Sequence, residues 1–174
     1  MARRTDLRKF QESLIERLQG SAQAESLGAK LGFMIGDDPW LIDLTSISEV
    51  LPVPELEPVP RARSWLIGIA NIRGHLYSVT DMGLFQGQPR VEIDGTSRVL
   101  LLNPKLIRGT ALLVTSTLGL RHQGQLSSET PLPGVESPWV QAVHHDREYR
   151  RWRELDVTRL VTDARFLEVS EQTE

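Results

Sequence analysis

Short runs of apolar residues separated by turn-forming residues dominate the chain from about residue 30 onward. Leu31–Ile35 and Trp40–Leu44 flank a Gly-Asp-Asp-Pro turn and predict a β-hairpin. The same pattern predicts further strands over 65–72, 75–80, 98–102, 111–115, 118–123, 139–144 and 149–155. Many short strands joined by polar turns favour a mainly β fold, built as barrels or as a sandwich, over a helical fold.

The other elements expected in this region are short. Ser46–Leu51, Asp81–Phe85 and Val157–Val161 each predict a short helix or single helical turn, and Phe166–Val169 predicts a last strand. Between the first of these and the next strand, prolines at 52, 54, 58 and 60 exclude regular ladder pairing. We therefore expect a surface loop over 52–63.

The first 29 residues have a different pattern and predict a separate segment. Residues 5–19 predict an amphipathic helix, followed by a linker over 20–29. The helical spacing is carried by the apolar residues Leu7, Phe10, Leu14, Ile15 and Leu18. Such a helix either packs on its own domain or contacts a partner. The domain organisation expected is thus 1–29 for the helix and linker and 30–169 for the β domain, which a polar loop over 86–96 divides into similar halves.

Composition and charge exclude several classes of function. The chain has no cysteine, which excludes disulfides and thiolate metal sites. The net charge of −3 and the 6% of aromatic residues argue against a nucleic-acid-binding barrel, which needs a basic groove with exposed aromatics. No apolar run approaches the length of a membrane span, and the N-terminus lacks the apolar core of a signal peptide. We therefore expect a cytoplasmic protein.

A search for catalytic and metal-binding patterns finds none. His75, His122, His144 and His145 lack the spacing of a zinc site, and each is better interpreted as a surface or internally satisfied histidine. The chain contains no nucleophile elbow and no phosphate-binding loop. We predict no catalytic residue, no metal and no cofactor, and therefore not an enzyme, although an unfamiliar active site would leave no signature.

The most informative segment is Gly68-Ile69-Ala70-Asn71-Ile72-Arg73-Gly74, an uncharged strand that ends in an arginine at a turn. Gly74 permits the positive φ that a tight reversal needs, and Gly68 leaves a gap into which a neighbour can approach. Arg73 would stand at the tip, where its guanidinium suits a carboxylate or backbone carbonyls. The alternative is an ordinary solvated turn arginine.

The run from Trp65 to Asp81 resembles the signature of the CheW-like chemotaxis coupling proteins, in which Gly-x-x-Asn-x-Arg-Gly joins two apolar strands and the second ends in Asp. Upstream, 36–43 resembles the family's first hairpin, Ile47–Val50 its receptor-facing turn and 52–60 its proline-bearing loop. The N-terminal extension, Ile69-Ala70-Asn71 and the ending 164–169 are closest to the branch that serves type IV pilus (twitching motility) chemosensory systems.

This resemblance implies a fold of two small, five-stranded, SH3-like β-barrels that share an apolar core, the first over about 30–87 and the second over about 97–165, with ends that can interleave. It implies an adaptor without an active site. Such an adaptor couples the cytoplasmic tip of a methyl-accepting chemotaxis receptor to the regulatory domain of a CheA-type histidine kinase, and it is recruited to receptor arrays at the inner membrane.

The same resemblance assigns roles to individual residues. Five positions match the partner-binding positions of the family: Arg73, Ile47, Glu49, Gly68 and Leu76. Asn71 and Gly74 match residues that form the turn. The chain departs from the family where an acidic residue of the second half is replaced around Thr115. Two alternatives stay open, a CheW of a flagellar chemotaxis pathway and, from another class, a small nucleic-acid-binding β-barrel.

Overall fold

The computed structural model describes residues 28–122, 124, 126–130 and 136–170. The strands are β1 (Ala29–Ile35), β2 (Asp38–Asp43), β3 (Ile47–Pro52), β4 (Leu66–Ile72), β5 (His75–Asp81), β6 (Arg98–Leu102), β7 (Thr110–Val114), β8 (Ser116–His122), β9 (Ser127–Glu129), β10 (Val140–His145) and β11 (Arg151–Leu155). The helices are η1 (Leu44–Ser46), α2 (Met82–Phe85), α3 (Val157–Thr162) and α4 (Ala164–Leu167). The prediction of a mainly β fold is confirmed, whereas the expected helix over 5–19 lies outside the described residues.

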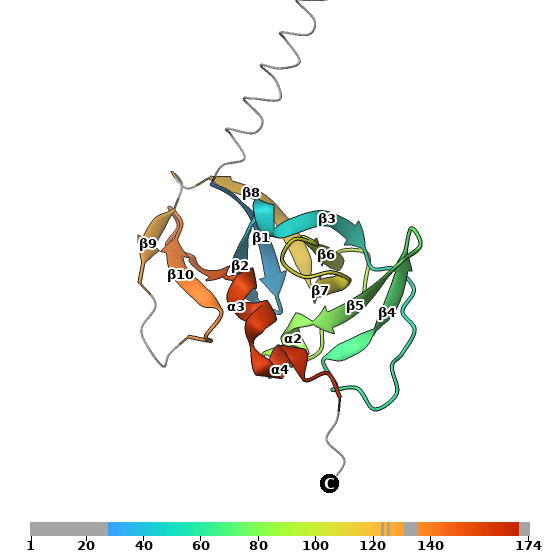
Figure 1. Ribbon diagram of the computed structural model, residues 1–174. Coiled ribbons are helices and arrows are strands. Elements are labelled where there is room, and N and C mark those ends of the chain that lie inside the picture. Colours follow the sequence, from blue (N-terminus) through green and yellow to red (C-terminus); the bar gives the residue numbers. More distant parts are fainter. Residues whose placement is uncertain (1–27, 123, 125, 131–135, 171–174) are drawn as a thin grey trace, which may run out of the picture.

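The strands form two sheets (Figure 1), one of six strands in the order β8-β1-β2-β11-β10-β9 and one of five in the order β3-β6-β7-β5-β4. Neighbouring strands are antiparallel except for β2 with β11 and β5 with β7, which are parallel. Both parallel pairs join strands from different halves of the chain. The six-stranded sheet therefore combines the first two strands with the last four, so the sheets do not coincide with the sequence halves 30–87 and 97–165.

One apolar core is shared by both sheets. Phe33 and Trp40 of the six-stranded sheet belong to the same buried cluster as Leu100 and Leu112 of the five-stranded sheet. A second, smaller cluster contains Val99 and its neighbours on the five-stranded sheet. Because side chains alternate between the two faces of a strand, β6 and β7 contribute to both clusters and are apolar on both faces.

The prediction of a helical turn over Ser46–Leu51 is wrong, because a short 3-10 helix ends at Ser46 and strand β3 follows. Asp43 starts η1 by accepting a hydrogen bond from the Thr45 backbone N–H at 2.8 Å. The pairing of β3 with β6 is irregular between Ile47 and Glu49, so an extra residue interrupts the alternation. The bulge explains why the apolar spacing in this segment imitates a helix.

Two other expectations for secondary structure are corrected. The strand predicted over Phe166–Val169 is replaced by helix α4, which Asp163 caps by accepting a hydrogen bond from the Arg165 N–H at 2.8 Å. The connection predicted over 124–138 contains strand β9, whose three residues are polar and exposed. Both elements are short and depend on contacts with distant parts of the chain, so local patterns do not predict them.

The proline-bearing segment over 52–63 is joined to β4 at one point. Glu57 and Ile69 exchange backbone hydrogen bonds of 2.9 and 2.8 Å. The approach is so close that a Cβ atom on the neighbouring Gly68 would stand 2.8 Å from the Glu57 carbonyl oxygen. Gly68 thus provides the gap in the strand that its sequence context predicts, and the Glu57 backbone fills it.

Substitution of Gly68 by alanine is expected to destabilise the protein by about 1–3 kcal/mol, because the added methyl group collides with backbone that cannot move aside easily. Urea denaturation followed by circular dichroism measures the change. The matched control is Gly95→Ala in an exposed loop, where an added Cβ meets no atom within 4 Å. Equal effects of the two substitutions would contradict this explanation of Gly68.

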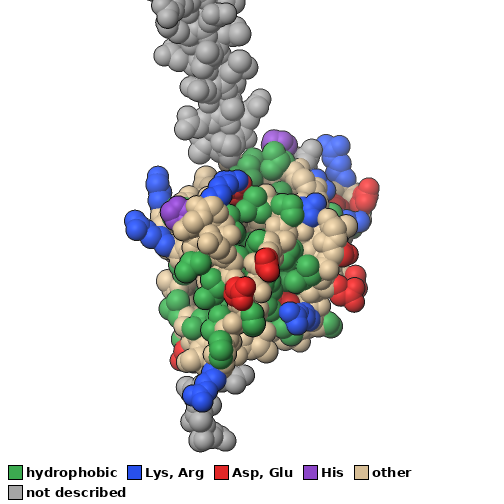
Figure 2. All heavy atoms as spheres, turned by 90° about the vertical axis from the view of Figure 1, so that its right-hand side faces the viewer, with side chains coloured by type: hydrophobic (Ala, Val, Ile, Leu, Met, Phe, Trp, Pro, Cys, Tyr) green, Lys and Arg blue, Asp and Glu red, His purple; other side chains and the backbone are tan. Residues whose placement is uncertain are grey.

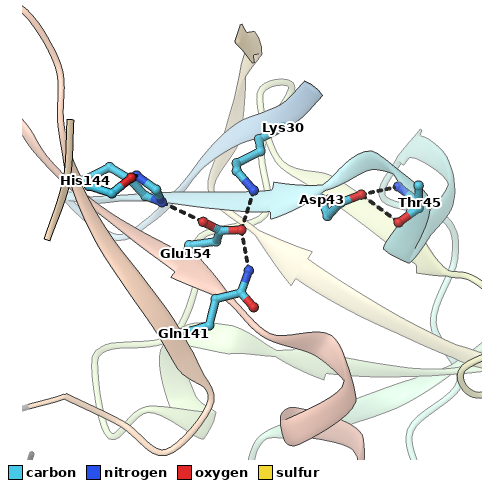
Figure 3. Close-up of polar contacts among 7 residues, drawn as sticks. Lys30, Asp43, Thr45, Gln141, His144 and Glu154 are labelled. Atoms are coloured by element: carbon cyan, nitrogen blue, oxygen red, sulfur yellow. Dashed lines mark hydrogen bonds and ion pairs between the residues drawn. The ribbon is translucent and has the colours of Figure 1, made fainter. Parts of the chain in front are cut away.

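A buried ionic network ties together strands of the six-stranded sheet (Figure 3). The Glu154 carboxylate on β11 accepts hydrogen bonds from Lys30 on β1 and Gln141 on β10, and the His144 Nε2 lies 2.5 Å from Glu154 Oε2. Ser128 Oγ, 3.0 Å from His144 Nδ1, extends the network to β9. The network thus spans strands that are not adjacent in the sheet.

The environment of Glu154 makes its carboxyl group unusually acidic. Burial by itself raises the pKa of Glu154, but the hydrogen bonds from His144 and Lys30 and the charge of Lys30 outweigh burial. Together these contacts lower the pKa from 4.5 to about 2. Glu154 is therefore ionised in the folded protein at neutral pH and balances the charge of the buried Lys30.

This pKa predicts how stability depends on pH. Because the folded pKa of Glu154 is about 2 and the unfolded value is 4.5, the stabilisation is fully present above pH 4.5 and is lost as pH falls toward 2. The difference corresponds to about 3 kcal/mol, at about 1.36 kcal/mol per pKa unit. We expect Glu154→Gln to be less stable than the wild type at pH 7 and the two to converge near pH 2, as measured by urea denaturation across this range. A gap that stays constant with pH would contradict this role of Glu154.

Candidate functional site

The tip of the β4–β5 hairpin presents Arg73. Arg73 and Gly74 are the two residues between the paired Ile72 and His75, and both have positive φ, of 53° and 83°. Two-residue hairpins with positive φ at both positions match the twist of the flanking strands. The Asn71 Oδ1 accepts a hydrogen bond from the Gly74 N–H at 2.9 Å. Asn71 and Gly74 therefore hold the turn that projects Arg73.

Arg73 forms a bidentate ion pair with Glu49 on β3. Its Nη1 and Nη2 lie 2.9 and 2.6 Å from the two carboxylate oxygens of Glu49. This hydrogen bonding, together with the charge of Glu49, raises the pKa of Arg73. Strands β3 and β4 are the opposite edges of the five-stranded sheet, so the pair shows that the sheet curls until its edges approach each other. The Arg73 side chain is nevertheless 71% exposed.

The structure brings together some of the expected partner-binding residues but not all. Leu76, on the returning strand β5, is 66% exposed. Ile47 begins β3, the strand that carries Glu49, and packs half-buried on the shared core. Gly68, in contrast, is buried, with the Glu57 backbone packed against it. We define the Arg73 corner as Arg73, Glu49, Leu76 and Ile47.

The loop between β6 and β7 belongs to the same region, although the sequence did not predict it as part of the site. Asn103 donates backbone and side-chain hydrogen bonds of 2.9 and 2.8 Å to the carbonyls of Ser46 and Thr45, just before Ile47. At its other end, the Gly109 carbonyl accepts a 2.8 Å bond from the Ser78 N–H, just beyond Leu76. The two ends of the loop are thus tied to residues next to Ile47 and Leu76, and the loop carries the exposed Leu106. The apolar pair Leu106-Ile107 within a turn was the signal available in the sequence.

The face that carries β3, β4 and β5 is rich in hydrophobic side chains. Figure 2 shows these side chains gathered on this face, with a few charged groups among them. Half-buried residues from these strands and from the following segment pack on the second cluster: Leu51, Val53, Leu56, Ile67 and Tyr77. Contiguous apolar surface of this kind is typical of protein-binding sites.

Two features are absent from the part of the chain that the structure describes. No group of three or more His, Cys, Asp or Glu side chains there could hold a metal ion. No helix in the same part of the chain is long and apolar enough to cross a membrane.

A comparison with known protein families matches residues 30–165 to the CheW-like domain. This chain belongs to the CheW-like domain family. The match spans both sheets and includes the Arg73 hairpin. It confirms the family predicted from the sequence around Gly68–Gly74.

Two individual proteins are similar to this CheW-like chain. Protein PilI of Pseudomonas aeruginosa is 25% identical over 156 residues, which are 88% of this chain and 86% of PilI. The crystal structure of the scaffolding protein TtCheW from Thermoanaerobacter tengcongensis has the same fold, with a TM-score of 0.64 and 15% identity over 84% of this chain and 97% of that one. The prediction of a CheW fold is thus confirmed, and the similarity to PilI agrees with the predicted resemblance to the pilus branch.

Two signature positions of this CheW-like chain have structural roles. Asp81, which ends the motif, is buried and accepts hydrogen bonds from the N–H groups of Leu84 and Val91 at 3.1 and 3.0 Å. Burial raises the pKa of Asp81 despite these bonds. Thr115, around which the sequence departs from the predicted family pattern, accepts a 2.9 Å hydrogen bond from the Gly36 N–H through its hydroxyl and so fixes the β1–β2 turn.

Proposed function

We propose that this protein is a non-enzymatic adaptor that couples methyl-accepting chemotaxis-type receptors to a CheA-type histidine kinase in a pathway that controls type IV pili. The observation that carries the proposal is the CheW-like domain over 30–165, in which the motif arginine stands exposed at a rigid hairpin tip. The similarity to PilI over most of both chains supports the assignment to pilus control.

The Arg73 corner suits binding rather than chemistry. Glu49 holds the guanidinium in one orientation, so little side-chain entropy is lost when a partner contacts it. Charged hydrogen bonds from such a group give orientation and specificity, while Leu76 and the apolar face supply buried area. The individual contacts can be weak, since receptors and kinases in an array bind many adaptors at once.

The shared core gives the adaptor its rigidity. Side chains from both sheets pack in one cluster, so the two sheets cannot move independently without opening a cavity. An adaptor of this kind transmits a change in receptor position to the kinase as a rigid body. We propose that it acts in the cytoplasm and reaches the inner membrane by binding to receptors.

Reconstitution with purified fragments tests the proposal. The full chain is mixed with the regulatory domain of the kinase and with the cytoplasmic tip of the receptor, both from the same organism, and complexes are separated by size-exclusion chromatography. We expect a ternary complex. The proposed coupling function is wrong if the chain elutes separately from each of the two fragments at concentrations where a known CheW assembles with its own partners.

A competition version of this experiment distinguishes a role in the pilus pathway from a role in a flagellar pathway. Kinase fragments from the pilus-associated and the flagellar chemosensory systems of the organism compete for a limiting amount of the chain. We expect the pilus-associated kinase to be retained. Preferential retention of the flagellar kinase would keep the adaptor role and overturn the pathway.

A further inference from the structure

The C-terminal segment 164–169 has no part in the Arg73 corner, yet it is anchored firmly in the fold. The ring of Phe166 on α4 stacks on Trp65 with centroids 6.0 Å apart and meets Phe85 edge-on at 5.3 Å. Phe166 is buried, whereas Leu167 and Val169 are 54% and 42% exposed. The anchor therefore leaves two apolar side chains facing outward.

Backbone pairing fixes the end of this segment against the residues that lead into β4. The Arg63 N–H donates to the Val169 carbonyl at 2.8 Å, and Ala62 forms a bridge with Ser170. Nearby, Arg61 has a φ of 56°, which is uncommon for a residue other than glycine. Such conformations persist only where the surroundings hold them, and they are frequent at binding sites.

Between α4 and the start of β4 lies a hollow with an aromatic wall and a basic rim. Its volume is about 220 Å³, and its lining residues are Arg63, Trp65, Phe85, Arg165 and Glu168. The Arg165 guanidinium lies over the ring of Phe85 at 5.5 Å and over that of Trp139 at 5.0 Å. Stacking on two rings keeps this guanidinium at the mouth of the hollow.

Arg63 and Arg165, the arginines at the rim of the hollow, lie beyond hydrogen-bonding distance of the nearby carboxylates Glu168 and Asp163. Arg63 Nη2 is 3.9 Å from Glu168, and Arg165 Nε is 3.7 Å from Asp163. Both distances exceed those of a hydrogen bond. The two guanidiniums thus keep donors that an incoming carboxylate can use.

We propose that this hollow and the exposed edge of α4 form a second docking surface, which binds a protein segment carrying carboxylates beside apolar side chains. The hollow is smaller than the roughly 300 Å³ or more of a small-molecule site, and it suits an inserted side chain. Arg63 and Arg165 fit the carboxylate, and Leu167 and Val169 extend the apolar contact.

This surface is separate from the Arg73 corner. The two lie at opposite ends of β4, about 25 Å apart for a strand that rises about 3.3 Å per residue. Figure 1 shows α4 at the bottom of the molecule and the β4–β5 tip at the upper right. A partner can therefore bind at α4 while the corner is occupied, and the proposal does not depend on the coupling function.

Titration of the isotope-labelled full chain, followed by NMR, tests the proposal. The probe is the hexapeptide Ala-Leu-Glu-Ile-Glu-Ala, acetylated at its N-terminus and amidated at its C-terminus. The control peptide has glutamine in place of both glutamates. We expect the acidic peptide to shift the Trp65 indole signal and the amides of 61–63 and 165–169 in a saturable way. The glutamine peptide should bind at least about tenfold more weakly.

Variants of the protein decide whether Arg63 and Arg165 are responsible for binding the acidic peptide. Arg63→Gln and Arg165→Glu should each weaken binding by about tenfold, whereas Arg147→Glu on the exposed β10–β11 turn should not change it. The dispersion of the same spectra reports folding, and Arg63→Gln keeps the test valid if loss of the Arg165 stacking unfolds α4. The proposal is overturned if the peptide shifts other regions instead, or if both peptides bind equally.

Discussion

Replacing Glu154 by methionine is expected to lower the free energy of unfolding by about 3–5 kcal/mol. Glu154 is 3% exposed and accepts hydrogen bonds from Lys30 and Gln141. Without its carboxylate, the buried Lys30 ammonium has no compensating charge, and His144 loses the partner of its Nε2 while keeping Ser128 at its Nδ1. Denaturation in urea at pH 7 measures the change, and a loss below 1 kcal/mol would show that the network contributes little.

A second substitution separates the cost of an unpaired charge from the value of the pair. Lys30→Met alone should also be destabilising, because it leaves Glu154 buried without its cation. The double variant Lys30→Met/Glu154→Met should lose much less than the sum of the two single losses. Glu129→Ala, on the exposed edge strand β9, is the matched carboxylate control and should change stability by less than about 0.5 kcal/mol.

The second large effect is expected on binding. Arg73→Glu should weaken association with the receptor and kinase fragments at least about tenfold, because it reverses the charge at the exposed tip and places it against Glu49. The fold should persist, since exposed ion pairs contribute little to stability. Isothermal titration calorimetry measures the affinities and circular dichroism the fold. The matched control is Arg159→Glu, an exposed arginine on α3 that pairs with Asp156.

Exchanging the charges distinguishes a direct contact from a structural role. The double variant Arg73→Glu/Glu49→Arg can restore the ion pair, but it moves the guanidinium from the hairpin tip to β3. We expect the double variant to match the wild type in thermal stability while its binding stays weak. Recovery of binding in the double variant would mean that Arg73 serves only to hold β3 against the hairpin.

The sequence predicted the elements in which local chemistry and tertiary structure agree. The β4–β5 hairpin is an example, because its strands are apolar and Asn71 and Gly74 suit a tight turn. Strand β3 was mispredicted because the bulge next to Ile47 disturbs the alternation that identifies a strand. Helix α4 was mispredicted because its conformation depends on the burial of Phe166 between Trp65 and Phe85, residues far away in the sequence.

For the candidate site, too, the sequence predicted what local patterns encode and not what depends on contacts between distant residues. The family signature drew attention to Arg73, but its ion pair with Glu49 requires the two edges of a curled sheet to meet, and no local pattern encodes that. Leu106 was missed because its loop reaches the site through hydrogen bonds from Asn103 to an unrelated turn. The network of Glu154 was equally hidden, since Lys30 lies at the other end of the chain. The sequence allowed His144 to be either a surface or an internally satisfied histidine, and it did not identify Glu154 as its partner.

The parallel pairing of β2 with β11 has a consequence for synthesis of the chain. Ile42 lies opposite Leu155, so β2 gains its parallel neighbour β11 only when the last strand has left the ribosome, although β1 of the same hairpin pairs with the earlier strand β8. All strands of the five-stranded sheet lie between residues 47 and 114, and this sheet can assemble earlier. A chain whose synthesis stops before residue 151 therefore has a complete five-stranded sheet but keeps the apolar strand β2 as an unpaired sheet edge, which makes it a substrate for chaperones and proteases.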